Sequence, residues 1–226
     1  DVCSSDLFDW NQNHNDLSQI AAASTLINGS PSNCAVASCD HGTAVIGELS
    51  SDANGVGTTG LVPAAGVRLA RVNGALVSNI PGAISAAAGQ FFKGAVILIE
   101  QQFSAGWDCN GDGAMTNVGG FLVPDYSGDQ VPAEQSAAVR DAIKVATANG
   151  RIVVEAAGNG NCDLDQAGFN GWFSLDASKD SGAILVGAGD RDTRDRASFS
   201  NFGARVDTHA EGDFQVTTTG YGFLYS

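Results

Sequence analysis

The sequence predicts an α/β protein, a three-layer α/β/α sandwich around a mostly parallel sheet. Two observations indicate this class. Short apolar runs bounded by turn residues alternate with amphipathic stretches along most of the chain. The length of 226 residues, 43% of them apolar, suffices for a single domain with a full core.

Four mainly apolar runs bounded by turn residues are as short as strands, which is typical of strands buried on both faces. These runs are Val67–Val72, Ala95–Ile99, Ile152–Val154 and Ala183–Val186. Residues 133–149, between the second and third runs, carry apolar side chains at i, i+3 and i+4 spacing and are followed by Gly150 as a stop. This order predicts a βαβ crossover between parallel strands.

A further helix is predicted over residues 80–88, which are rich in alanine. Pro81 suits its first turn, and either Asn79 or Ser78 suits its N-cap. The helix falls between the first two predicted strands, so it supports the same α/β alternation.

Residues 103–130 interrupt the alternation. They are rich in Gly, Asp and Asn and longer than most connections, which predicts a surface insertion. Residues 108–113 within it resemble the first half of a calcium loop, but the closing acidic position falls on Gly119. An Asx- and Gly-rich turn is therefore the preferred interpretation.

The charge of the chain excludes several partners. It has 11 Lys and Arg against 25 Asp and Glu, a formal net charge of −14. Nucleic acids and anionic lipid surfaces require basic patches, so we expect neither as a partner. No run approaches about 18 apolar residues, so no membrane span is predicted. We expect a monomer.

The five cysteines leave two interpretations open. Cys34 and Cys39 lie close in a loop and suit a local disulfide, while Cys109 and Cys162 suit a second one and leave Cys3 over. This pattern, like the acidic and Lys-poor composition, favours an extracellular protein. The alternative is five free thiols in the cytosol.

The heptapeptide Asp1–Leu7 (DVCSSDL) has the sequence obtained when a widely used sequencing-library adapter is translated in one frame. We therefore expect residues 1–7 to be read-through, and the domain itself to span residues 8–226. Without Cys3, four cysteines remain, which fits two bridges. Native codons continuing upstream through the heptapeptide in genomic reads would contradict this.

His41 is the histidine with the most suggestive context. Small residues follow it in the run His41–Gly47, which allows a helix start to pack closely against a neighbour. The positive end of a helix dipole disfavours an imidazolium. With a carboxylate partner, such a histidine acts as a strong general base, as in a hydrolase triad. His14 and His209 are given no catalytic role.

Asn159 follows the predicted strand at Ile152–Val154 and stands between Gly158 and Gly160. Functional sites of open α/β sheets lie at the carboxyl ends of strands, and an amide there is able to donate to a developing oxyanion. The alternative is an ordinary turn. A phosphate-binding loop is disfavoured, since neither a G-x-G-x-x-G nor a Walker pattern occurs.

Three groups of motifs together resemble the subtilisin-like serine proteases, in order and approximate spacing over about residues 8–222. They are His41–Thr43 with Asn54-Gly55 and Gly60–Pro63, then Ala156–Asn159, then Val186–Ala188 with Ala197–Gly203 and Val206-Asp207. Each group is weak alone, but three in sequence make a specific pattern.

The resemblance implies that His41 is the general base and Asn159 the oxyanion donor. It also implies two walls of a specificity pocket, along which a polypeptide substrate pairs as an added strand. These walls are Glu100, Gln101 and Gln102 on one side and Ala156, Ala157 and Gly158 on the other. Glu100 and Glu155 would favour basic substrate side chains. No cofactor is implied, save structural calcium, for which Asn54 is a candidate ligand.

Two members of the triad have no good candidate. The family's aspartate is expected near Ser5, and no Gly-Thr-Ser motif for the nucleophile occurs before the chain stops at Ser226. We therefore expect a peptidase domain truncated before its serine and C-terminal helices, and inactive as a fragment of a secreted serine endopeptidase. The alternative is a non-catalytic binding or scaffold domain with a protease-like fold.

Overall fold

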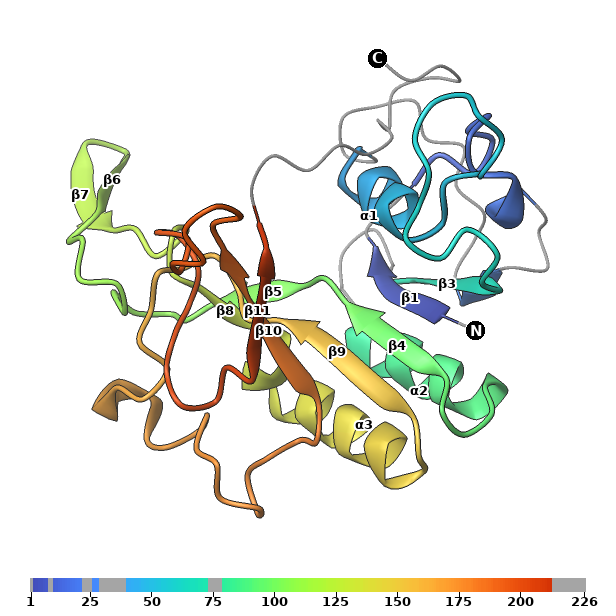
Figure 1. Ribbon diagram of the computed structural model, residues 1–226. Helices are drawn as coiled ribbons and strands as arrows, with labels where there is room; N and C mark the ends of the chain where they lie inside the picture. The colour runs from blue at the N-terminus through green and yellow to red at the C-terminus, as the bar shows by residue number, and fades with distance from the viewer. Residues whose placement is uncertain (1, 8–9, 22–25, 29–39, 73–78, 213–226) are drawn as a thin grey trace. The chain divides into compact units, whose positions relative to one another are not determined.

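The computed structural model describes residues 2–7, 10–21, 26–28, 40–72 and 79–212 (Figure 1). The chain divides into two compact units. Unit 1 comprises residues 1–100, 145–153 and 215–226, and unit 2 comprises residues 101–144 and 154–214. Strand β9 (Ile152–Ala156) begins in unit 1 and ends in unit 2.

Unit 1 contains four parallel strands in the order β4-β1-β3-β2. They are β1 (Val2–Leu7), β2 (Leu26–Asn28), β3 (Val67–Arg71) and β4 (Val96–Ile99). Ile152, the first residue of β9, donates its N–H to the carbonyl of Ala95 at 3.0 Å. Leu69 of β3 and Ile97 of β4 are fully buried, which confirms two of the predicted core strands.

Two helices complete the described part of unit 1, α1 (Asp40–Ser50) and α2 (Ile80–Gln90). Asn79 caps α2, because its Oδ1 accepts a hydrogen bond from the Gly82 N–H at 3.1 Å, and Pro81 lies in the first turn as predicted. One core cluster joins α1 to β3 and the segment before β2; its buried members are Trp10, Leu17, Ile20, Ile46, Val67 and Leu69.

Unit 2 continues the parallel pairing. Strand β10 (Ile184–Gly189) pairs with β9 and with β11 (Thr208–Glu211). Helix α3 (Ala137–Ala148) lies mostly in unit 2. Gly150, two residues after its end, has a φ of 81°, which favours glycine. Of the stripe predicted for this helix, Val139, Ala142, Ile143 and Ala146 are buried, whereas Ala138, also placed on it, is exposed. Parallel strands alternating with helices confirm the α/β class.

The prediction of one helix from residue 133 is wrong at its start. Ala133–Gln135 form a 3-10 turn, Ser136 is extended, and the α-helix begins at Ala137. The reason is tertiary: the main-chain N–H of Glu134 donates to the buried Glu155 carboxylate at 2.8 Å. This contact outweighs the local helix preference.

The predicted insertion starts in β5 (Gln102–Ser104) and ends in β8 (Gln130–Pro132), and these two strands pair in antiparallel fashion. Between them, β6 (Met115–Val118) and β7 (Phe121–Pro124) form a two-stranded hairpin, which pairs with no other strand in the described part of the chain (Figure 1). Its apolar side chains, including Phe121, are exposed. None of the described helices combines the length and apolarity needed to cross a membrane.

Candidate active site

Asn159 lies just beyond the carboxyl end of β9, in unit 2, with an exposed side chain. Its main-chain N–H donates to Oε1 of Gln102 on β5 at 2.8 Å. The structure therefore brings Gln102 against the predicted oxyanion segment. Among the described residues, no group hydrogen-bonds to the Asn159 carboxamide, so both of its N–H groups are available to a ligand.

The two glycines beside Asn159 are required by close packing. A Cβ on Gly158, whose φ is +90°, would lie 2.8 Å from both the Asn201 Nδ2 and the Gln130 carbonyl oxygen. A Cβ on Gly160 would lie 2.5 Å from the same carbonyl oxygen. The loop thus has no room for side chains on either side of Asn159, which fixes its path against the Gln130 main chain.

The predicted wall residues of unit 2 differ in their access to solvent. Gln101, Ala157 and Gly158 are buried, while Gln102 and Ala156 are partly accessible. Glu100 is the last residue assigned to unit 1. The roles given to these residues in substrate binding stay predictions.

His41 lies in the first turn of α1, in unit 1, and its side chain is exposed. Desolvation by the surrounding protein lowers its pKa below the ordinary value of 6.5. The ring is thus neutral at pH 7, the form that accepts a proton. The position at a helix start agrees with the same preference, since the helix dipole disfavours an imidazolium.

Glu100 follows β4 and carries a strongly perturbed carboxyl. Burial, and then the negative charge of Glu48, raise its pKa from 4.5 to about 7. Half of such carboxyl groups are protonated at neutral pH, so Glu100 offers a substrate less negative charge than its residue type suggests. This weakens the expectation that it selects basic side chains.

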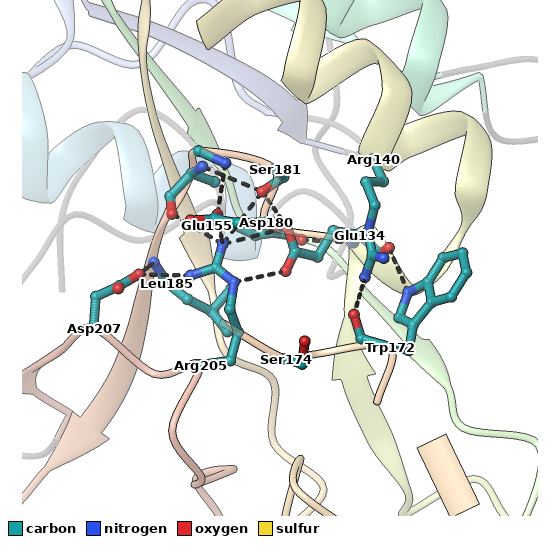
Figure 2. Close-up of polar contacts among 12 residues, drawn as sticks. Glu134, Arg140, Glu155, Trp172, Ser174, Asp180, Ser181, Leu185, Arg205 and Asp207 are labelled. Carbon is teal, nitrogen blue, oxygen red and sulfur yellow. Dashed lines mark hydrogen bonds and ion pairs between the residues drawn. The ribbon is translucent and has the colours of Figure 1, made fainter. Parts of the chain in front are cut away.

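Glu155 was expected near the substrate, and the structure contradicts this. The side chain is fully buried and accepts the Glu134 N–H, so it does not reach a substrate. Figure 2 shows it within a polar network, in which Arg205 Nε lies 3.2 Å from Glu134 Oε1. Arg205 Nη1 also donates to Asp207 at 2.7 Å. The sequence analysis missed this network.

A disulfide joins Cys109 and Cys162 in unit 2, as predicted. Cys162 comes three residues after Asn159, so the bridge anchors the segment that carries the predicted oxyanion donor to the insertion. The two sulfurs and Asp129 are the only clustered metal-ligand types in the part of the chain described. Sulfurs joined in a disulfide are not thiolate ligands. The expected bridge between Cys34 and Cys39 lies outside the described residues.

The two loops considered for calcium use their side-chain oxygens within the protein. Asp108 accepts hydrogen bonds from the N–H groups of Gly111 and Gly113 at 2.7 and 3.1 Å, as in an Asx turn. Asn54 Oδ1 accepts the Val56 N–H at 2.8 Å. Calcium at either loop stays a prediction.

Comparison with known proteins gives a family match over nearly the whole chain. The profile of the subtilase family, a peptidase family, matches residues 11–223. This chain belongs to the subtilase family. No curated protein matches it.

Solved structures show the same fold. A cold-adapted subtilisin-like serine proteinase matches 97% of this chain at 19% identity and a TM-score of 0.58. An epidermin leader peptide processing serine protease from Staphylococcus aureus matches 93% at 23% identity and a TM-score of 0.59. Proteases from Pseudoalteromonas arctica match 100% at 20% identity and a TM-score of 0.56. The chain spans 65%, 51% and 71% of these three chains. The subtilisin-like α/β fold predicted from the sequence is thereby confirmed.

Proposed function

We propose that the full-length protein is a secreted serine endopeptidase that hydrolyses polypeptide bonds through an acyl-enzyme. Membership of the subtilase family supports the class. The observation that carries the proposal is the carboxamide of Asn159 just beyond the end of β9, which is exposed and neither accepts nor donates a hydrogen bond among the described residues. The disulfide between Cys109 and Cys162 supports an oxidising, extracellular setting.

In this proposal His41 and Asn159 divide the work. The neutral imidazole of His41 takes the proton of the serine hydroxyl as that oxygen attacks the substrate carbonyl, and returns it to the leaving amine. Asn159 donates a hydrogen bond to the carbonyl oxygen as negative charge develops there. The domain is expected to span residues 8–226, and we place both the nucleophilic serine and the aspartate outside it. On this proposal the 226-residue chain alone does not cleave peptides.

The test uses the full-length gene product with His41→Ala, and with His209→Ala, an exposed histidine of β11, as a matched control. We expect the first change to lower kcat/KM by at least about 10³-fold and the second to leave it unchanged. Unchanged turnover in His41→Ala would contradict the proposal. A full-length protein without peptidase activity would instead indicate the non-catalytic scaffold. Labelling of the 226-residue fragment by a fluorophosphonate would contradict its inactivity.

A further inference from the structure

We infer that Asn201 is a positioning residue for Asn159, holding the loop at residues 157–162 in the conformation that aims the oxyanion donor. The inference rests on the proposed function, since it assigns Asn159 that role. Asn201 lies in the stretch before β11 and is fully buried, so it acts only through the loop.

The Asn201 side chain contacts three main-chain groups in two segments. Its Nδ2 donates to the carbonyl of Ala157 at 2.6 Å and to the carbonyl of Gln130 at 2.7 Å. Its Oδ1 accepts the N–H of Cys162 at 2.8 Å. The Asn201 main-chain N–H adds a fourth bond, to the carbonyl of Gly158 at 3.1 Å.

These four bonds bracket Asn159. Ala157 and Gly158 precede it, Cys162 follows it, and the Gln130 main chain packs against both flanking glycines. Asn159 has no side-chain hydrogen bond of its own among the described residues, so its direction is set by the loop. The loop in turn is held on its buried side by Asn201 and on its exposed side by Gln102.

Asparagine is the side chain that satisfies this site. A carboxamide supplies two N–H donors for the two carbonyls and one acceptor for the N–H. Aspartate has nearly the same shape, but it has no donor and would face two carbonyl oxygens with negative charge. Leaving buried carbonyls without donors is costly, so the loop would move to find water.

Displacement of a catalytic group by about 1 Å is enough to lower turnover by about 10²-fold. We therefore expect Asn201→Asp in the full-length protein to lower kcat by at least about tenfold with little change in KM, because the oxyanion forms only in the transition state. Asn201→Ser, which keeps one donor, serves as the milder variant if Asn201→Asp does not fold.

The matched control is Ser181→Ala. Ser181 is equally buried in unit 2 and hydrogen-bonds to Glu134 and Arg205, away from the loop. The Ser181→Ala substitution should lower the stability of the protein without changing kcat. The decisive comparison adds each change to Asn159→Ala. If Asn201 acts through Asn159, Asn201→Asp should lower kcat hardly any further in the Asn159→Ala background. If it damages the structure independently, the losses of kcat from the two changes should add as free energies.

A second measurement needs no activity. In the 226-residue chain, Asn201→Asp should speed hydrogen exchange of the Asn159 and Cys162 amides at least about tenfold while the Leu185 amide of β10 keeps its rate. Uniform acceleration, or additive losses of kcat in the double variant, would overturn the inference. An inactive parent protein would overturn the proposed function instead, and the exchange result would still decide whether Asn201 holds the loop.

Discussion

Arg205 has a charged side chain that is only 2% exposed. Its Nε lies 3.2 Å from Glu134 Oε1 (Figure 2). Its Nη2 donates to the Ala183 carbonyl at 3.0 Å. Glu134 is 1% exposed and also accepts the Ser181 hydroxyl. Such a pair is costly to desolvate, so its partners depend on one another far more than exposed ion pairs do.

Removing one partner of the pair should therefore lower the free energy of unfolding much more than removing both. We expect Arg205→Met to lower the free energy of unfolding by about 3–5 kcal/mol, because Glu134 is left buried and unpaired. Adding Glu134→Gln to the same variant should restore most of the loss. Urea unfolding of the three proteins measures this, and equal losses in the single and double variants would show that the pairing is not what matters.

Residues of the candidate site differ in how visible they are in the sequence. His41 and Asn159 are marked by their immediate neighbours, so local motifs suffice to propose roles for them, and those roles stay predictions. Asn201 and Arg205 were missed in these roles because each bonds to a segment 71 residues away, Gln130 and Glu134 respectively. Nothing local distinguishes a buried Asn or Arg from an exposed one.

Elements were predicted best where one physical cause decides them. The strands at Val67 and Ile184 and the cap at Asn79 follow from apolar runs and from capping chemistry. The start of α3 was misplaced because the contact between Glu134 and Glu155 decides it, and no periodicity encodes that contact. The hairpin at β6 and β7 was seen only as an insertion, since its strands are short and solvent-exposed.

The disulfide ties the insertion to the segment after β9, across a sequence separation of 53. Closing a loop of this length restricts the unfolded chain, so replacing both Cys109 and Cys162 by alanine should lower the free energy of unfolding by about 4 kcal/mol. The measurement is urea unfolding with and without a reducing agent. Reductant should destabilise the parent more than the double variant, in which the bridge expected between Cys34 and Cys39 is the one left to reduce; a parent that loses no more stability than the double variant would contradict this.

Glu100 and His41 should make the stability of the chain depend on pH with opposite signs. Glu100 has its pKa raised to about 7 by burial and by Glu48, so between pH 4.5 and 7 the folded state keeps a proton that the unfolded state has lost. Its contribution therefore falls as pH rises. His41 has a lowered pKa, so the stability it contributes is lost as pH falls below 6.5.

Glu100→Gln isolates the first contribution, because the His41 contribution cancels in the comparison. Between pH 5 and 7.5 the parent should lose up to about 3 kcal/mol of unfolding free energy relative to this variant. Parallel curves for the parent and Glu100→Gln would contradict the prediction.

Among the strands that the structure describes, those of the hairpin at Met115–Pro124 pair only with each other, and Gly119 and Gly120 form their turn with φ of 60° and 93°. A short tag, or a cysteine that carries a dye, placed at that turn would therefore disturb no strand pairing outside the hairpin. The turn is therefore a suitable site for immobilisation or fluorescence labelling. The exposed apolar side chains beside it, such as Phe121 and Leu122, should be replaced by polar ones before concentrated solutions are prepared.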